Sequence, residues 1–396
     1  MRSLLHPSCE IKAMSRLWFD ARFRSYLWQS LIMLAFLATV TWLTANTLDN
    51  LVRRGIQTGF GFLSRPARFP IAEGFLAYDP TNPYLKAFAV GLLNTLYISM
   101  IVIVVATAFG FCIGLGRRSL NPLVRGLASC FVETMRNTPL VVQLLFWYAL
   151  LTIGLPAPRA ALEPMPGLFL SLRGLFFPWP IVEGGSGLFG SALLLGSAMA
   201  LRAFAWQACL GRPKRRSPPL CAGLGGLAIL LLGLTVWASD IRISLDQPVL
   251  RGFNFTGGAT LTPEFMALVV GLVLYTAAFV AEIVRGGIDA VPKGQWEGGR
   301  ALGLREEHIL WLIVVPQALR IIVPPMTSQF LNVVKNTTLA LAVGYPDFAS
   351  VMATTINQTG QAIEGVLILM SVYLAISLSV STFMNWYNRR MMLVTR

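Results

Sequence analysis

Residues Leu92 to Gly116 read LLNTLYISMIVIVVATAFGFCIGLG, and this stretch decides the fold class. Its apolar residues lie on every face of the helix that it predicts, whereas a helix on the surface of a soluble protein has one apolar stripe. The run is also long enough to cross a lipid bilayer, which takes about 20 residues. We therefore expect lipid around this segment.

The rest of the chain repeats this pattern. Its 396 residues are 55% hydrophobic and 13% charged, and the apolar residues gather in long runs. We therefore predict an all-α integral membrane protein with about eight transmembrane helices. The predicted spans lie at about 26–46, 88–115, 139–156, 186–206, 220–238, 264–284, 321–343 and 366–387.

The basic residues predict the orientation. The formal net charge is +14, but the Lys and Arg residues lie in short segments between apolar runs and form no nucleic-acid-binding face, so we expect no nucleic-acid partner. With the N-terminus inside, twenty of the 32 basic residues fall in inside segments and nine in outside segments. Since positive charge marks cytoplasmic loops, we predict that both termini are cytoplasmic.

The spans divide the chain into four parts. Residues 1–87 are expected to hold a cytoplasmic N-terminus, a retained anchor span at about 26–46 and an outer segment rich in proline. Residues 157–262 form an insert, whose hairpin of two spans is joined by the basic turn Gly211–Arg216 and is expected to pack against lipid. The parts at 88–156 and 263–390 contain the other five spans.

The loop from about 285 to 316 contains the most informative motif. Glu297 to Pro316 reads EGGRALGLREEHILWLIVVP. In a helix starting near Gly294, Gly299 and Gly303 would leave one face bare, and Glu297, Ala301 and Arg305 would form a neighbouring row. Glycines destabilise an exposed helix, so docking into a groove of a partner is one interpretation. A flexible amphipathic loop is the other.

The spacing of this motif resembles that of a known family. Glu297-Gly-Gly, three residues, Gly303, nine residues and then Ile313-x-x-Pro316 are similar to the EAA loop of ABC importer permeases, with Gly298 and Gly299 where the family usually has alanines. In that family a short coupling helix sits in a cleft of the ATPase. The resemblance implies that the ATPase-coupling residues are Glu297, Gly298, Gly299, Ala301, Gly303 and Arg305.

Flanking motifs narrow the resemblance to the polar amino-acid uptake permeases: Gly91–Thr95, Arg136–Gln143, Tyr275–Ile288, Val291–Gln295 and Pro316–Arg320. The anchor and the hairpin resemble the longer Q-type permeases of general L-amino-acid or glutamate/glutamine/aspartate/asparagine importers. The resemblance implies a type I, MetI-like permease core in the bacterial inner membrane. The implied partners are a second, homologous permease subunit, two ATPase subunits that hold ATP and Mg, a periplasmic amino-acid-binding protein, and the amino-acid substrate.

Several helix ends carry their own signals. Thr262, Pro263 and Glu264 predict the start of span six, and Gly286-Gly287 predicts its end. Glu282 and Arg285, three residues apart, are expected to pair near that end. Thr138-Pro139 predicts the start of span three, which places Gln143 one turn into the membrane. Gln143 either lines a polar pathway or joins neighbouring helices by hydrogen bonding.

Span seven is the least lipid-like segment. Its polar residues suit an amino-acid pathway, and the pair Pro324-Pro325 is expected to break the helix there. The alternative is that Lys335 and Asn336 only fasten this helix to its neighbours. With Gln143, the candidate residues of the substrate pathway are Gln329, Asn332, Lys335, Asn336 and Thr337.

The sequence lacks the motifs of nucleotide-binding, metal-binding and catalytic sites. The sequence has no GxxxxGK[ST] phosphate loop, so we expect no cofactor on this chain and nucleotide on a partner. His6 and His308 have no metal-ligand or triad spacing, which predicts neither a metal site nor a catalytic residue. A secondary transporter coupled to protons or sodium is the alternative function, although Glu282 is its single acidic candidate. A membrane enzyme or a scaffold protein is a further alternative function.

Overall fold

The computed structural model describes residues 21–53, 55, 59–74, 76–183, 196 and 242–391 of the chain. The predicted hairpin spans and the basic turn between them lie outside the described residues, except for Gly196. The chain divides into two compact units. The first consists of Met1–Asn94 and Pro346–Thr382, and the second of Thr95–Tyr345 and Phe383–Arg396. The predicted division into four parts stays a prediction.

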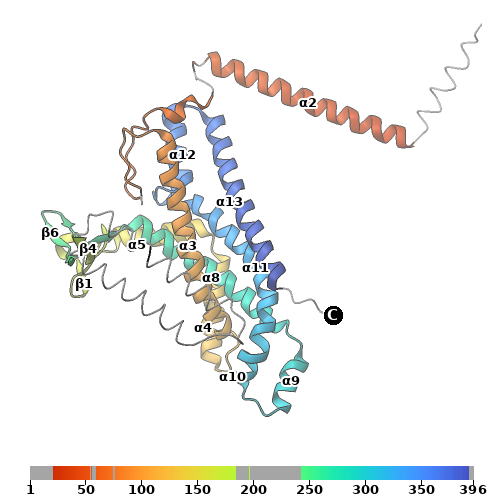
Figure 1. The fold of residues 1–396 in the computed structure, drawn as a ribbon, viewed down its shortest axis with the longest axis vertical. Helices are drawn as coiled ribbons and strands as arrows, with labels where there is room; N and C mark the ends of the chain where they lie inside the picture. The colour runs from red at the N-terminus through yellow and green to blue at the C-terminus, as the bar shows by residue number, and fades with distance from the viewer. Residues whose placement is uncertain are drawn as a thin grey trace, which may run out of the picture. The chain divides into compact units, whose positions relative to one another are not determined.

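Five helical stretches of the described part are long and apolar enough to cross a membrane. They are α2 (Ala21–Arg53), α3 (Tyr84–Gly116), α8 (Pro263–Asp289), the stretch Glu306–Ala342 and α13 (Ala362–Met391) (Figure 1). A shorter apolar helix, α5 (Leu140–Ile153), matches the third predicted span, at about 139–156. The helical membrane fold is therefore confirmed, and the total of about eight spans stays a prediction because the hairpin is not described.

Helix α8 begins where the sequence predicts and ends later. The hydroxyl oxygen of Thr262 accepts a hydrogen bond from the Phe265 amide at 3.2 Å, and Pro263 follows in the first turn. The predicted end at Gly286-Gly287 is wrong, because the helix continues to Asp289. Gly287 instead allows close packing, since a side chain there would collide with Ile322 of α11 (Val315–Asn336).

Helix α5 does not begin with the predicted cap. The Thr138 hydroxyl donates backward to the carbonyl of Thr134 at 2.8 Å, and Pro139 is the residue before the helix. Thr138 therefore ends the preceding amphipathic helix, α4 (Pro122–Asn137), which the sequence analysis did not predict. The proline at this junction provides no N–H and fixes an extended backbone, so the two helices are separate.

The expected break in span seven is also absent. Helix α11 runs through Pro324 and Pro325 without interruption and continues as a 3-10 helix, η4 (Thr337–Ala342). A π-helix, η3 (Ile309–Val314), precedes it, after the short α10 (Glu306–His308). The irregular turns therefore lie at the two ends of this span and not at its prolines.

In the second unit, α3 and α8 approach closely through small residues. A side chain at Gly110 or Gly114 would come within 3 Å of Val280 or Val284, so these two glycines allow the backbones to touch. An apolar core joins α3, α5, α8 and η4, and a second core joins α8, η3 and α11. These contacts hold α8 in a fixed place among its neighbours.

Short strands flank the part that is not described. Figure 1 shows them gathered beside the N-terminal part of α8. They add a small antiparallel β region, which the sequence analysis did not predict, to the helical fold. Their pairings are β1-β2-β3-β8, β4-β5 and β6-β7. A 3-10 helix, η2 (Pro158–Ala160), precedes the strands. The strands are β1 (Leu162–Met165), β2 (Leu168–Ser171), β3 (Gly174–Phe177), β4 (Trp179–Glu183), β5 (Arg242–Asp246), β6 (Val249–Arg251), β7 (Asn254–Thr256) and β8 (Ala259–Leu261).

The first unit has an aromatic core. A 3-10 helix, η1 (Phe60–Ser64), and the segment after it pack on the start of α3 and on α12 (Phe348–Thr359). The ring centres of Phe62 and Tyr84 are 5.8 Å apart, and those of Phe88 and Phe348 are 6.0 Å apart. The proline-rich segment is therefore part of a packed structure.

Candidate functional site

The predicted coupling loop contains a short helix, α9 (Lys293–Ala301), close to the predicted start at Gly294. Its end differs from the prediction. Gly303 has a φ of +72°, its amide donates to Arg300 O at 2.9 Å, and the amide of Leu304 donates to Gly299 O at 3.2 Å. This pair of bonds is the Schellman end of a helix, which needs a left-handed residue and favours glycine.

Two geometric predictions about this loop are therefore wrong. Gly303 and Arg305 lie beyond the helix, so they extend neither the bare face nor the row with Glu297 and Ala301. Gly299 is buried, because Ile309 occupies the space where its side chain would be. Gly294 and Gly298 are the exposed pair four residues apart, with open space around them. The bare face of α9 is thus made by Gly294 and Gly298.

A cluster of ion pairs lies at the end of α8. Glu282 accepts hydrogen bonds from three guanidinium groups: from Arg285 at 2.5 Å, from Arg136 of α4 at 3.0 Å, and from Arg117, directly after α3. The predicted pair of Glu282 and Arg285 is confirmed. The Arg117 side chain is 12% exposed and that of Glu282 is 28% exposed, so both are largely removed from water. One carboxylate therefore holds three helices together.

This cluster extends to α9. Asp289, at the last residue of α8, pairs with Arg285 at 3.6 Å and with Arg118 at 3.1 Å. The guanidinium of Arg118 lies 5.1 Å from the centre of the Trp296 ring in α9, within the range of a cation–π contact. The α9 helix is thus connected to Glu282 by direct side-chain contacts.

The cluster also reaches a polar cavity between α8 and α11. Arg136 lies 5.3 Å from the ring centre of Phe279, one turn before Glu282. Phe279 lines a cavity of about 130 Å³, together with Tyr275, Thr276, Gln329, Asn332, Val333 and Asn336. Amides and hydroxyls in such a cavity can replace the hydrogen bonds that a polar solute makes with water.

The structure thus brings together three of the six predicted pathway residues, Gln329, Asn332 and Asn336. The other three do not line this cavity. Lys335 is exposed, and Thr337 is buried and donates to Val334 O at 2.8 Å. Gln143 donates to Met135 O at 2.9 Å and to Thr138 O at 3.0 Å, so its amide group joins α5 to α4.

Sequence analysis missed the α8 side of the cavity and most of the arginine cluster. Tyr275, Phe279 and Glu282 are spaced four and three residues apart, so they follow one face of the helix. That spacing could have indicated that these three side chains lie on one face of α8. Arg117, Arg118 and Arg136 were counted as cytoplasmic charge, and no local pattern indicated that they converge on one carboxylate.

The chain matches one protein-family model over residues 103–393. That family is described as the binding-protein-dependent transport system inner membrane component. The matched residues include the arginine cluster, the cavity, α9 and α11.

Three curated proteins are similar over nearly their whole length. A protein named as an amino-acid ABC transporter permease, YhdX of Escherichia coli (strain K12), is 45% identical over 94% of this chain and 95% of its own. The general L-amino acid transport system permease protein AapQ of Rhizobium johnstonii is 42% identical over 96% and 94%. The glutamate/glutamine/aspartate/asparagine transport system permease protein BztB of Rhodobacter capsulatus is 36% identical over 97% of both chains.

Proposed function

Because the chain belongs to the family of binding-protein-dependent transport system inner membrane components, we propose that it is the permease subunit of an ATP-driven ABC importer for polar L-amino acids. It forms half of the translocation pathway and performs no catalysis itself. The names of the three relatives, all of them amino-acid permeases, support the substrate class.

The proposed complex has three kinds of protein partner. A second, homologous permease subunit completes the pathway, two ATPase subunits bind ATP and Mg, and a periplasmic binding protein delivers the amino acid. The protein lies in the inner membrane as a multi-pass protein, with both termini on the cytoplasmic side. The excess of basic residues in the segments then placed inside supports this orientation.

One observation carries the proposed mechanism. Side-chain contacts run without a gap from Trp296 in α9, through the ion-pair cluster of Glu282, to Phe279 at the polar cavity. When the ATPases close, α9 moves with them, and the ion pairs transmit that movement to the ends of α3, α4 and α8. The resulting tilt of α8 against α11 opens or closes the cavity.

The geometry does not favour an ion-coupled transporter. Glu282 is the residue that the sequence analysis named as a candidate proton relay, and its carboxylate accepts hydrogen bonds from three arginines. Such a carboxylate is strongly stabilised in its charged form and is a poor proton carrier. The arrangement is consistent with transport that is driven by ATP hydrolysis and coupled through α9.

Uptake by the complete complex in sealed vesicles tests the proposal. With the binding protein outside and ATP inside, we expect accumulation of labelled polar L-amino acids that stops when ATP is omitted and continues in the presence of a proton or sodium ionophore. An ATP-free complex that accumulates amino acids until an ionophore is added would contradict the proposal.

A further inference from the structure

A second cavity lies entirely within the first unit. It has a volume of about 710 Å³ and lies between the segment after η1 and the end of α12. In the predicted topology, residues 47–87 follow the first span and residues 344–365 precede the last one, so both walls belong to outer segments. The packing of the segment after η1 on α12 is consistent with this placement. The cavity therefore lies on the side from which a binding protein delivers its amino acid.

One arginine at this cavity is held in an unusual backbone conformation. The φ of Arg68 is +59°, a left-handed value that is disfavoured for residues with a side chain. The turn is fixed by hydrogen bonds from Arg68 N to Pro80 O at 2.8 Å and from Ala67 N to Asn82 O at 2.9 Å. Residues that the surrounding structure holds in this way are concentrated at functional sites, which makes the Arg68 side chain a candidate for binding.

The charge of Arg68 is not neutralised by the described part of the chain. Its side chain is exposed and forms no ion pair with a described residue. Among those residues, no acidic side chain lines the cavity. The guanidinium can therefore donate hydrogen bonds to an anionic group that enters from outside.

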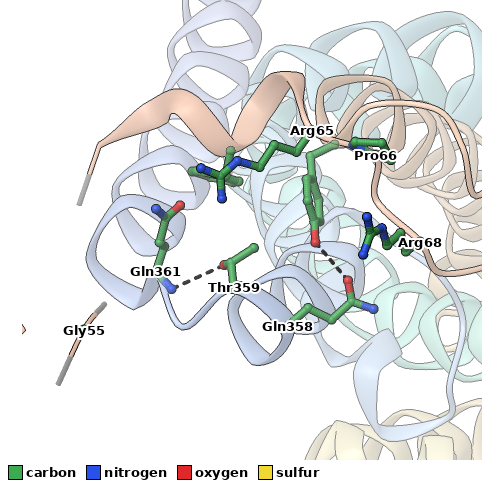
Figure 2. A pocket seen from close by; sticks show the side chains of 9 residues that line it. Gly55, Arg65, Pro66, Arg68, Gln358, Thr359 and Gln361 are labelled. Atoms are coloured by element: carbon green, nitrogen blue, oxygen red, sulfur yellow. Dashed lines mark hydrogen bonds between the residues drawn. The ribbon is translucent and has the colours of Figure 1, made fainter. Parts of the chain in front are cut away.

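A glutamine side chain of the opposite wall lines the same cavity. In the view of Figure 2, Arg68 lies toward Gln358, at the end of α12. The Tyr84 hydroxyl donates to Gln358 Oε1 at 2.9 Å, which leaves the Nε2 group of that amide as a donor. Tyr84 is 6% exposed and its ring packs against Phe62, so the hydroxyl that holds the amide is itself firmly placed. One guanidinium and one amide donor in a cavity match a single carboxylate.

We propose that Arg68 and Gln358 receive an acidic side chain of the binding protein when that protein docks, an inference that rests on the proposed function. A free carboxylate is a weaker match, because a single exposed arginine–carboxylate pair changes a dissociation constant by only about fivefold. Such a contact is useful as one part of a larger interface, where it also speeds association. The cavity is as large as a site for a whole small molecule, so it has room for the side chain and the loop that carries it.

Docking of the fluorescently labelled binding protein to the complete complex in lipid nanodiscs tests this contact. Arg68→Asn removes the charge and keeps a residue that tolerates the left-handed conformation. We expect the dissociation constant to rise about fivefold and to depend less steeply on salt concentration. Arg53→Gln removes the same charge from an exposed arginine outside the cavity, and it should leave the dissociation constant unchanged.

A second variant leaves Arg68 and its turn intact. Gln358→Glu places a carboxylate in the cavity with the guanidinium, so the arginine gains a partner within the chain and docking should weaken about as much as in Arg68→Asn. Acidic residues of the binding protein, replaced by amides one at a time, then identify the group that enters the cavity. Its replacement should weaken docking to the unaltered complex but not to Arg68→Asn.

Three results would overturn the assignment. The first is equal affinity of the unaltered complex, Arg68→Asn and Gln358→Glu, and the second is a loss in Arg53→Gln as large as that in Arg68→Asn. The third is displacement of the binding protein by sodium acetate but not by sodium chloride at the same concentration, which would indicate a site for free carboxylates. A binding protein that does not dock on the unaltered complex at all would contradict the proposed function, and this inference with it.

Discussion

The guanidinium of Arg136 lies 5.3 Å from the ring centre of Phe279, and the same group donates to Glu282 at 3.0 Å. Arg136 therefore contacts both the ion-pair cluster and a residue that lines the polar cavity. Because the cluster also reaches Trp296 of α9 through Arg118, one set of contacts joins the coupling helix to the cavity. We propose that these contacts couple movement of α9 to the cavity, and mutations can distinguish this role from a purely structural one.

The first prediction concerns Glu282. In Glu282→Gln, three arginines lose their shared carboxylate, and we expect the free energy of unfolding to fall by roughly 1–3 kcal/mol, since the cluster is partly exposed. ATP hydrolysis should continue while uptake falls, so that the number of amino acids imported per ATP drops about tenfold. Both rates are measured on the same vesicles.

The matched control for this change is Glu133→Gln. Glu133 is exposed on α4 and forms no ion pair with a described residue, so its loss changes the charge equally without touching the cluster. In this control, the number of amino acids imported per ATP should stay the same as in the unaltered protein. An unaltered ratio in Glu282→Gln would mean that the cluster only stabilises the protein.

The second prediction compares two adjacent glycines of α9. Gly299→Val places methyl groups against Ile309 and should destabilise the loop by about 1–3 kcal/mol. Gly298→Val meets nothing within the chain and should fold normally, because valine is no worse than glycine in an exposed helix. It covers the bare face, however, and should reduce the ATPase that co-purifies. Melting temperature and co-purification are the two measurements, and full assembly of Gly298→Val would exclude this face from docking.

The third prediction compares a residue that lines the polar cavity, Asn336, with the exposed residue next to it, Lys335. Asn336→Leu replaces a polar lining group by a larger apolar one and should raise the KM for amino-acid uptake about tenfold, since a polar solute loses a hydrogen-bond partner. Lys335→Met, one residue earlier, should stay within about twofold because Lys335 is exposed and does not line the cavity. Uptake kinetics with labelled amino acids measure both. The opposite ranking would place the pathway on the Lys335 side of α11.

The membrane helices could be predicted from sequence because their signal is local. A run such as Leu92–Gly116 has no polar face, and the start of α8 at Thr262-Pro263 depends on neighbouring residues alone. The roles of Gly287 and Gly303 were predicted wrongly because glycine serves two different structural purposes. Gly287 gives space to Ile322 within a helix, whereas Gly303 provides a left-handed end. The sequence does not distinguish these uses.

The candidate site could be predicted only in part for the same reason. Gln329, Asn332 and Asn336 were found because polar residues in an apolar span are conspicuous. Arg117 and Arg136 come from different helices and meet Glu282 only in the folded chain. The strands within the insert were missed because each is three to five residues long, and because two of their pairings, β3 with β8 and β4 with β5, join segments that are far apart in the sequence.

The fourth prediction concerns Asp347, which is completely buried at the start of α12. Burial raises the pKa of its carboxyl from the ordinary 3.8 to about 6, although hydrogen bonds from the amides of Ser350 and Ala349 and from the Tyr373 hydroxyl act in the opposite direction. Between pH 4 and 6, roughly, the folded protein holds a proton that the unfolded chain has released. The contribution of Asp347 to the free energy of unfolding should therefore be fully present below about pH 4 and should be lost as pH rises to about 6, by up to about 3 kcal/mol.

Asp347→Asn tests this directly, because asparagine retains the capping oxygen and carries no charge. Melting temperatures at pH 4.5 and 7.5 should show that the unaltered protein loses more stability between these values than the variant. Asp79→Asn is the control: hydrogen bonds from Thr81 lower the pKa of Asp79 below 3.8, so it stays ionised throughout this range. Its pH dependence should match that of the unaltered protein. If Asp347→Asn also matched it, the buried carboxyl would not be the group that binds the proton.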